Sequence, residues 1–415
     1  MKKVLIVSHL PVGPETNVGK TLYNLFVNYP QDKLAEVYFK EEGCTIDIER
    51  YHISDYQVLN SLLNRGKNTS QIIQRQAQDS ANNIRKPIFN LRSPFLLLVR
   101  DFVWLLNKRE RQNLIEWVKE IKPDAIFLAP GYSGFPYDLA RCISNTMSIP
   151  LYIYFMEDFY NERRFTISPF FWIRYFLFRK TVNKCVSVAS KVFSLNDALS
   201  REFRDCFNRP VTTIFNPAIL NNCHREEANN NGVYTIVYAG SIGYSRIEII
   251  NKVGDVINTL SKKYPVSFYV YGYPFNKEIE ASLRNNKGIH FMGATSSEKL
   301  AHIIKNANAV LHVESFEKKY IAKTKKAFST KIPEYLASGN LVIAIGPKEI
   351  ESIHYLSESE SALIIDNKEN IQIELEGVLS GKLDVDRIIS NAREIMAKNH
   401  NPHVIQKILY NEIND

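Results

Sequence analysis

Short apolar runs alternate with longer amphipathic segments through the first half of the chain. Residues 3–8, 121–131 and 149–159 each hold an uninterrupted run of apolar residues, many of them β-branched or aromatic. Such runs are typical of strands that are buried on both faces of a parallel sheet. Helix-forming segments follow them, the first at about residues 21–28. The alternation therefore predicts an α/β architecture built from βαβ units.

The same alternation starts again near residue 234, after an Asn-rich polar stretch at 224–232 that has the composition of a linker. The chain has 415 residues, which is too long for one ordinary domain. Its apolar fraction of 45% is enough for packed cores. The pattern therefore predicts two domains of similar type, each built around a parallel sheet.

The stretch at residues 329–346 carries the strongest chemical signal. It combines a polar start, a predicted short helix from Pro333 to Ser338 and a buried strand. The polar start consists of Ser329, Thr330 and Lys331. Ser and Thr are preferred as helix N-caps, and Pro suits the first helical turn. Gly339 stands where a helix would end in a left-handed residue.

This helix start has the properties of an anion site. Unpaired N–H groups and the positive end of the macrodipole attract anions, and Lys331 adds a full charge there. Glu334 lies one turn deeper, where its carboxylate could accept hydrogen bonds from two vicinal hydroxyls. A nucleotide diphosphate with its ribose would satisfy both features. The alternative is that these residues only cap and solvate a helix.

The run K-x-x-E-Y-L-A-S-G-x-x-V-I-A in this stretch resembles the donor-site helix of GT-B glycosyltransferases, most closely that of glycosyltransferase family 4. In that family the glutamate that matches Glu334 holds the ribose of the sugar nucleotide, and residues at the helix start hold the diphosphate. A second glutamate usually lies eight positions earlier, close to the sugar. Lys326 occupies that position here, which weakens any inference about the sugar and the stereochemistry.

The resemblance implies a fold and a domain order. GT-B enzymes have two Rossmann-like domains that face each other across a cleft. Residues 1–217 would form the acceptor-binding domain and residues 218–398 the sugar-nucleotide-binding domain. Residues 399–415 would form a C-terminal helix that crosses back to the first domain.

The resemblance also implies an activity. The expected enzyme moves a sugar from a UDP- or GDP-sugar to a hydroxyl of a glycan or lipid-linked acceptor, with retention of configuration and without a metal. The expected role is bacterial surface polysaccharide synthesis. A sugar-nucleotide epimerase of the same fold and a non-enzymatic basic surface-binding module are the alternatives.

Two further positions are expected to contact the donor from the second domain. Gly240 and Gly243 follow a predicted strand and precede a helix, which gives backbone N–H groups close access to an anion. Arg246 then stands where the family places a basic phosphate contact. Negative charge gathers on the leaving diphosphate as the glycosidic bond breaks, and Lys331 and Arg246 would stabilise it.

The segment from Gly13 to Thr21 nearly matches the phosphate-binding P-loop. That motif has four residues between its first glycine and Gly-Lys-Thr, whereas five lie between Gly13 and Gly19. The loop geometry depends on this count, so an ATPase is the less favoured interpretation. Under the glycosyltransferase resemblance, Gly19 lets the backbone approach the donor diphosphate because glycine has no side chain in the way.

Glu157 and Asp158 end the predicted strand at 149–159. The carboxyl ends of strands are where α/β enzymes place catalytic groups, and a carboxylate there could take the proton of an acceptor hydroxyl. The alternative is that the two acids cap the next helix or pair with Arg163 or Arg164.

Residues 163–184 mix aromatic with basic side chains. This composition suits a helix at an anionic lipid surface, and family members dock their first domain on the inner membrane face in this way. The alternative is a core helix whose arginines extend to its rim.

The formal net charge of +8 and the pI near 9.0 favour a negatively charged partner. Nucleotide sugar and anionic membrane fit this charge, and the resemblance gives no role to nucleic acid. The five cysteines form no C-x-x-C pair, which suits a reducing compartment and argues against zinc. The first residues read as a strand, and no apolar run is long enough to span a membrane. We expect a cytoplasmic protein, with possible peripheral attachment to the inner face of the cell membrane.

Overall fold

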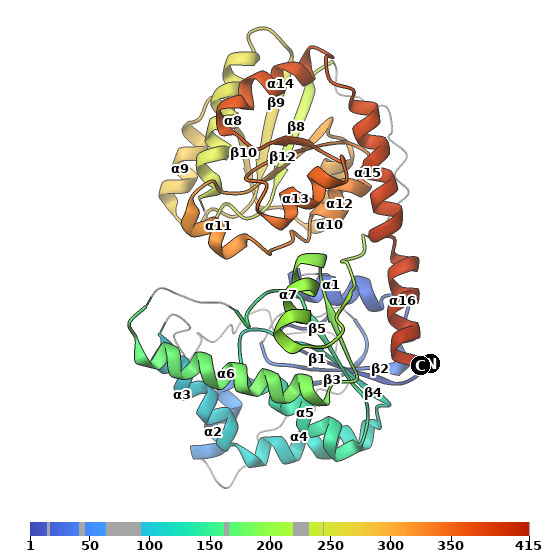
Figure 1. Ribbon diagram of the computed structural model, residues 1–415. Coiled ribbons are helices and arrows are strands. Elements are labelled where there is room, and N and C mark those ends of the chain that lie inside the picture. The colour runs from blue at the N-terminus through green and yellow to red at the C-terminus, as the bar shows by residue number, and fades with distance from the viewer. Residues whose placement is uncertain are drawn as a thin grey trace. The chain divides into compact units, whose positions relative to one another are not determined.

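The computed structural model describes most of the chain. The described residues are 1–14, 17–40, 46–63, 93–161, 166–218, 232–243 and 245–414. The chain divides into two compact units. Unit 1 consists of residues 1–215 together with 405–415, and unit 2 consists of residues 216–404. Each unit has one parallel sheet with helices packed around it (Figure 1). The predicted α/β class with two Rossmann-like parts is confirmed.

Unit 1 contains a seven-stranded sheet in the order β3-β2-β1-β4-β5-β6-β7. The strands are β1 (Val4–Ser8), β2 (Leu34–Tyr38), β3 (Glu49–His52), β4 (Ala125–Ala129), β5 (Leu151–Phe155), β6 (Lys191–Ser194) and β7 (Thr212–Thr213). Every residue of β1, β4 and β5 is buried, as their apolar runs predicted. In the register of the sheet, Ile6 of β1 lies between Glu36 and Phe127.

The helices of unit 1 include one from the end of the chain. They are α1 (Asn17–Phe26), η1 (Gln31–Lys33), α2 (Asp55–Leu63), α3 (Pro94–Leu106), α4 (Lys108–Ile121), α5 (Phe135–Met147), α6 (Pro169–Val188), α7 (Asp197–Phe207) and α16 (Pro402–Asn414). Gln406 donates to the Asn24 carbonyl at 2.7 Å, and Lys2 N–H donates to Asn414 at 2.8 Å. The two ends of the chain therefore lie side by side in unit 1 (Figure 1).

Unit 2 contains a six-stranded sheet in the order β10-β9-β8-β11-β12-β13. The strands are β8 (Tyr234–Ala239), β9 (Val266–Tyr271), β10 (His290–Gly293), β11 (Ala309–Val313), β12 (Leu341–Ile345) and β13 (Leu363–Ile365). The helices are α8 (Arg246–Leu260), α9 (Lys277–Asn285), α10 (Ser297–Lys305), α11 (Lys318–Thr324), α12 (Ile332–Ala337), α13 (Glu351–Glu358), η2 (Lys368–Asn370), α14 (Ile371–Leu379) and α15 (Val385–Asn399). One part of its core consists of the apolar faces of α8 and α14 against the sheet, and further buried apolar side chains lie on α12, α13 and α15.

His400 connects the segment by which the chain enters unit 2 to the segment by which it leaves. Its ring is fully buried, with Nδ1 2.8 Å from the Asn216 carbonyl and Nε2 2.8 Å from the Tyr355 hydroxyl. Ala218 N–H in turn donates to the His400 carbonyl at 3.0 Å. Burial lowers the pKa of His400 to about 4, although the bond to Asn216 opposes this shift. The imidazole is therefore neutral at physiological pH.

In the ranges that the structure describes, no helix is both long enough and apolar enough to cross a membrane.

The neutral His400 predicts a loss of stability in acid. Its pKa is about 4 when folded and near 6.5 when unfolded, so between these values the unfolded chain binds more protons. Stability from this group is therefore present above pH 6.5 and is lost as the pH falls toward 4. Lowering the pH from 7 to 5 should cost the native protein roughly 1–2 kcal/mol more than the His400→Gln variant.

Calorimetric unfolding at a series of pH values measures this difference. His403→Gln, at an exposed position of α16, is the matched control for the loss of a histidine. Parallel pH curves for the native protein and His400→Gln would contradict the assignment.

Candidate functional site

The order of strands in unit 2 reverses between β8 and β11. From β8 the chain proceeds to β9 and β10 on one side of the sheet, and β11, β12 and β13 lie on the other side. Ligands of open α/β sheets bind at the carboxyl ends of the strands where this reversal occurs. The segments that leave β8 and β11 are therefore the first place to search for a site.

An ion pair joins these two segments. Arg246, the first residue of α8, places Nη2 2.9 Å from both carboxylate oxygens of Glu314, which directly follows β11. The Glu314 side chain is only 4% exposed and that of Arg246 17%. Burial raises the pKa of the Glu314 carboxyl, while the charge of Arg246 acts in the opposite direction. The guanidinium is thus held in one orientation at the strand reversal.

His312 lies beside this pair on β11. Its Nε2 is 3.1 Å from the Ser352 hydroxyl and 3.5 Å from Glu314 Oε1. Burial lowers the pKa of His312 to about 3, so its ring is neutral. Its hydrogen bond to Ser352 makes it a packed strand residue that supports Glu314.

The short helix α12 is attached to the same end of β8. The buried Tyr335 hydroxyl donates to the Ala239 carbonyl, the last of β8, at 2.8 Å. Burial is the main cause of the raised pKa of the Tyr335 hydroxyl. The charge of Glu334 also raises this pKa, and the charge of Arg246 lowers it. Glu334 and Arg246 therefore belong to one neighbourhood.

The polar start of α12 is only partly as expected. Ser329, Thr330, Lys331 and Glu334 are partly exposed, whereas the apolar side chains of the helix are buried. The expected Ser or Thr cap is wrong, because Lys331 itself is the N-cap residue and no side chain caps the helix. Ser329 instead uses its carbonyl and hydroxyl to accept from Ile332 and Lys331 N–H groups. Asn216 donates to the Thr330 carbonyl at 3.4 Å.

The start of α12 owes its positive charge mainly to a side chain and not to the helix dipole. Helix α12 has six residues, so its dipole contributes little and the Lys331 ammonium is the main cation at this end. Its other end agrees with the sequence, since Gly339 has a φ of +75°.

The glycine loop after β8 packs against the loop after β9. Gly240 N–H donates to the Tyr271 carbonyl at 3.0 Å, so this amide is engaged within the sheet edge. A Cβ on Gly272 would lie 2.2 Å from the Gly240 carbonyl, which makes Gly272 a required glycine that the sequence did not single out. A Cβ on Gly243 would meet the Phe275 ring at 2.2 Å, but that ring is 71% exposed and can move.

The expected residues of unit 1 lie near the carboxyl ends of its strands. Gly19 is buried in the first turn of α1, because this helix begins at Asn17, before the expected start at residue 21. Glu157 is exposed just after β5. Asp158 accepts from Asn161 N–H at 3.0 Å, so it closes a turn rather than capping the next helix, which begins at Pro169. Arg163 and Arg164 lie outside the described residues.

Two backbone amides of the loop after β1 are engaged within the protein. Val12 N–H donates to the buried carboxylate of Glu36 at 2.6 Å, and Gly13 N–H donates to the Gly19 carbonyl at 3.3 Å. These two N–H groups are thus engaged by the protein itself and are not directed at a phosphate.

Unit 1 also has a polar cluster at its own strand reversal, between β1 and β4, which the sequence did not reveal. Arg100 Nε lies 2.8 Å from Asp55 Oδ1, and its Nη1 donates to the Ser133 hydroxyl at 2.8 Å. His9, which follows β1, lies beside the Tyr132 ring, and burial lowers its pKa to about 4. These residues come from four separate segments, so no sequence motif contains them.

Among the described residues, no group of three or more His, Cys, Asp or Glu side chains could hold a metal ion. An Asp-x-Asp pair, Asp384 and Asp386, occurs at the start of α15. Asp384 accepts from Arg387 N–H at 3.1 Å and therefore serves as a helix cap.

Comparison with known proteins agrees with this architecture. Residues 254–409 match the model of a family described as glycosyl transferase-like. No curated protein gave a significant match. Anabaena Alr3699/HepE in complex with UDP is 13% identical, with a TM-score of 0.65 and coverage of 99% of both chains. The UDP-forming α,α-trehalose-phosphate synthase from Burkholderia xenovorans is 12% identical, with a TM-score of 0.63, and the match covers 100% of this chain and 99% of that chain.

The chain has the GT-B fold. Full-length agreement with these structures confirms this part of the resemblance found in the sequence. The segment that the family model matches, residues 254–409, includes Glu314, Lys331 and Glu334 but not Arg246.

The Arg246–Glu314 pair predicts a strong asymmetry between single and double substitutions. Arg246→Met leaves a buried carboxylate without its partner and should lower the free energy of unfolding by about 3–5 kcal/mol at pH 8. Arg246→Met combined with Glu314→Leu removes both charges and should cost much less. Urea denaturation measures both values.

Lys252→Met provides the control from the same helix. Lys252 pairs with Glu369 at the surface, where the loss of an ion pair costs less than about 1 kcal/mol. Equal losses for Arg246→Met and the double variant would show that the pair carries no coupling.

Proposed function

We propose that this protein is a glycosyltransferase whose donor is a UDP-sugar, held in unit 2 at the reversal between β8 and β11. One observation carries the proposal: the Arg246–Glu314 pair and the Tyr335–Ala239 bond bring a fixed guanidinium and α12 to the same strand end. The family match supports the reaction class. Structural neighbours bound to UDP or UDP-glucose support the choice of nucleotide.

Each side chain has a distinct proposed role. Arg246 and Lys331 neutralise the charge that develops on the diphosphate as the bond between the sugar C1 and the phosphate oxygen breaks. Glu314 accepts hydrogen bonds from Nη2 of Arg246 and so fixes the orientation of the guanidinium at the strand end where the diphosphate is proposed to bind. Glu334 accepts hydrogen bonds from the ribose hydroxyls. Glu314 is thus a positioning residue.

We propose smaller roles for the other site residues that the sequence predicted. Ser329, Thr330 and Gly243 would contact the diphosphate through backbone or hydroxyl groups, whereas Gly240 shapes the loop because its N–H is engaged. Gly19 would contact the diphosphate through the start of α1. Glu157 or Asp158 would accept or position the proton of the acceptor hydroxyl. We further propose retention of configuration and no metal requirement.

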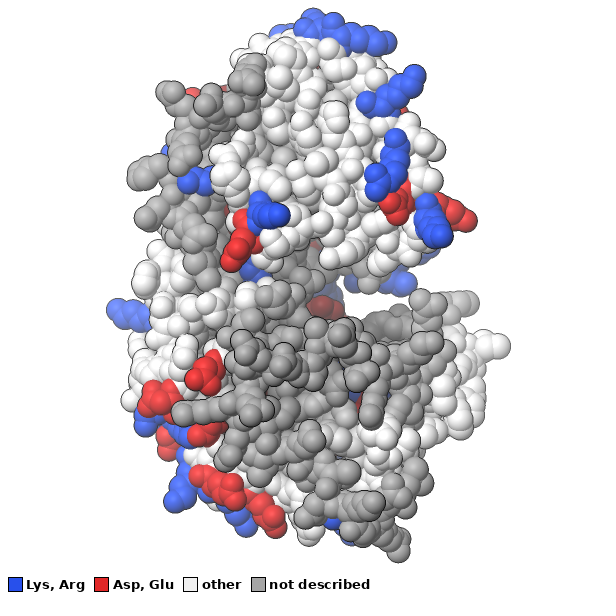
Figure 2. Space-filling view, turned by 180° about the vertical axis from the view of Figure 1, so that it is seen from behind, with Lys and Arg blue, Asp and Glu red and all other residues white. Residues whose placement is uncertain are grey.

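The surface of unit 2 does not favour the alternative of a basic nucleic-acid-binding module. Figure 2 shows Lys and Arg side chains scattered over this face, several of them next to acidic ones. Lys252 pairs with Glu369, and Lys368 with Glu248. A nucleic-acid-binding face would need a continuous basic stripe.

A membrane-associated glycan or lipid-linked acceptor is proposed for unit 1, within bacterial surface polysaccharide synthesis at the inner face of the cell membrane. Helices α3 and α6 share one exposed apolar surface, because the Phe95 and Phe170 rings lie 5.0 Å apart. Its members are Phe95, Phe102, Leu105, Leu106, Phe170, Ile173, Phe176 and Leu177. Arg174 pairs with Asp101, whereas Lys180 and Lys184 are exposed. Aromatic residues beside exposed lysines suit an anionic bilayer.

The donor proposal is tested by binding. UDP-glucose should raise the melting temperature more than GDP-, ADP- or CMP-sugars do, because a bound donor stabilises the fold by mass action. Calorimetric titration with UDP should give about tenfold or greater weakening in Glu334→Ala, which loses charge-assisted hydrogen bonds to the ribose. Glu358→Ala, exposed on α13, is the control. Unchanged UDP affinity in Glu334→Ala would remove this glutamate from the site.

The catalytic proposal is tested by turnover. Lys331→Ala should reduce kcat more than tenfold, since a cation directed at the leaving diphosphate acts mainly in the transition state. The rate of UDP-glucose hydrolysis, measured as the UDP released, provides an assay that needs no identified acceptor. Lys318→Ala, exposed on α11, should retain the native rate. A native rate in Lys331→Ala would exclude Lys331 from catalysis.

A further inference from the structure

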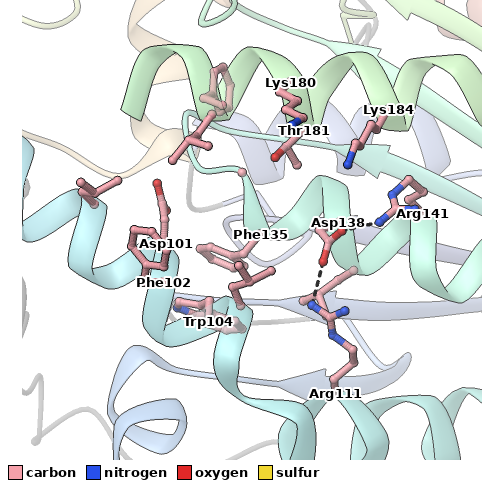
Figure 3. Close-up of a pocket in the computed structure, with 16 residues that line it drawn as sticks. Asp101, Phe102, Trp104, Arg111, Phe135, Asp138, Arg141, Lys180, Thr181 and Lys184 are labelled. Atoms are coloured by element: carbon pink, nitrogen blue, oxygen red, sulfur yellow. Dashed lines mark hydrogen bonds and ion pairs between the residues drawn. The ribbon is translucent and has the colours of Figure 1, made fainter. Parts of the chain in front are cut away.

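A separate cavity of about 300 Å³ lies in unit 1, among α3, α5 and α6 (Figure 3). This volume is at the lower end of those known for ligand pockets. None of the residues proposed above for the donor lines it, but the lining shares Phe102, Leu105, Leu177, Lys180 and Lys184 with the surface proposed to face the membrane. Its lining divides into an aromatic end and a cationic end.

The aromatic end has a rigid floor. The rings of Trp104 and Phe135 stack with centroids 3.8 Å apart, and both side chains are buried. Trp104 is fixed further by donation to Asp55 at 2.8 Å. Phe102 and Leu105 continue this end outward and are 47% and 56% exposed. The floor is therefore continuous with the exposed apolar surface of α3 and α6.

The cationic end has four basic side chains and one carboxylate. Its basic residues are Arg111, Arg141, Lys180 and Lys184. Asp138 lies between the two arginines, 2.7 Å from Arg111 Nη2 and 2.6 Å from Arg141 Nη2 (Figure 3). The carboxylate thus orients both guanidiniums and neutralises only part of the positive charge, so this end remains suited to an anion.

We propose that this cavity binds one anionic lipid, with its phosphate at the cationic end and the first part of its hydrocarbon chain on the Trp104–Phe135 floor. A free phosphate would leave the aromatic floor without a contact, and a neutral apolar molecule would leave the four cations without a counter-charge. The opening onto the apolar surface of α3 and α6 gives the rest of a long chain a place to lie. This inference is independent of the transfer reaction.

Calorimetric titration with dodecyl phosphate, kept below its micelle concentration, tests the proposal on the full-length protein. The native protein should bind it saturably with one site. Inorganic phosphate lacks the chain, and dodecylphosphocholine lacks the net negative charge, so each should bind at least tenfold more weakly.

Substitutions at the two ends separate the contributions of head and chain. Lys180→Glu with Lys184→Glu should weaken binding at least tenfold by reversing charge at the cationic end. Leu105→Asp should do the same at the apolar end, and its exposed position leaves the fold intact. Thr181→Phe, which fills the cavity from α6, should abolish binding. Lys33→Glu with Lys119→Glu, both exposed elsewhere on unit 1, is the control of equal charge and should bind normally.

Several outcomes would overturn the proposal. These are the absence of saturable binding, equal affinity for inorganic phosphate, equal weakening in the control, or native affinity in Leu105→Asp and Thr181→Phe. The thermal shift with UDP-glucose should be unchanged in all these variants. A failure of the lipid site is therefore distinguishable from a failure of the donor site.

Discussion

The buried ion pair between Arg246 and Glu314 is the constraint on which the candidate donor site depends. It joins the segment after β8 to the segment after β11, which lie 68 residues apart in the chain. A buried pair of this kind gives little net stability, because the cost of removing both charges from water offsets their attraction. Its effect is orientation: the guanidinium stays charged and fixed at the reversal of the strand order. The Tyr335–Ala239 hydrogen bond fixes α12 to the same point.

The sequence predicted those features that depend on neighbours along the chain. The apolar runs of β1, β4 and β5 predicted buried parallel strands, and the stretch around Pro333 and Gly339 predicted a short helix. Glu314 and Gly272 were missed because their roles come from contacts with distant segments, the Arg246 side chain and the Gly240 carbonyl. An acid directly after a buried run was a usable signal for Glu314, since the same reasoning singled out Glu157 and Asp158. The side-chain cap of α12 failed because the helix begins two residues beyond Thr330.

Helix α6 shows why a mixed sequence can support two interpretations at once. Two of its arginines are engaged within the protein, since Arg174 pairs with Asp101 and Arg179 lies 3.9 Å from the centre of the Tyr160 ring. Its lysines and several of its aromatic rings remain exposed. A helix with buried apolar residues on one side and exposed apolar residues on the other has no clean amphipathic period. Residues 163–184 therefore could not be assigned from their pattern alone.

The acidic groups that lie beside each basic side chain show how the net positive charge of the chain is distributed. On α8 and η2 the surface lysines pair with glutamates, so they add little field at a distance. At the cavity of unit 1 the arrangement differs, because Asp138 orients Arg111 and Arg141 there while four basic side chains line the same end. Glu314 and Asp138 both hold arginine side chains in a fixed orientation, so in each unit a carboxylate positions a guanidinium beside a proposed anion site.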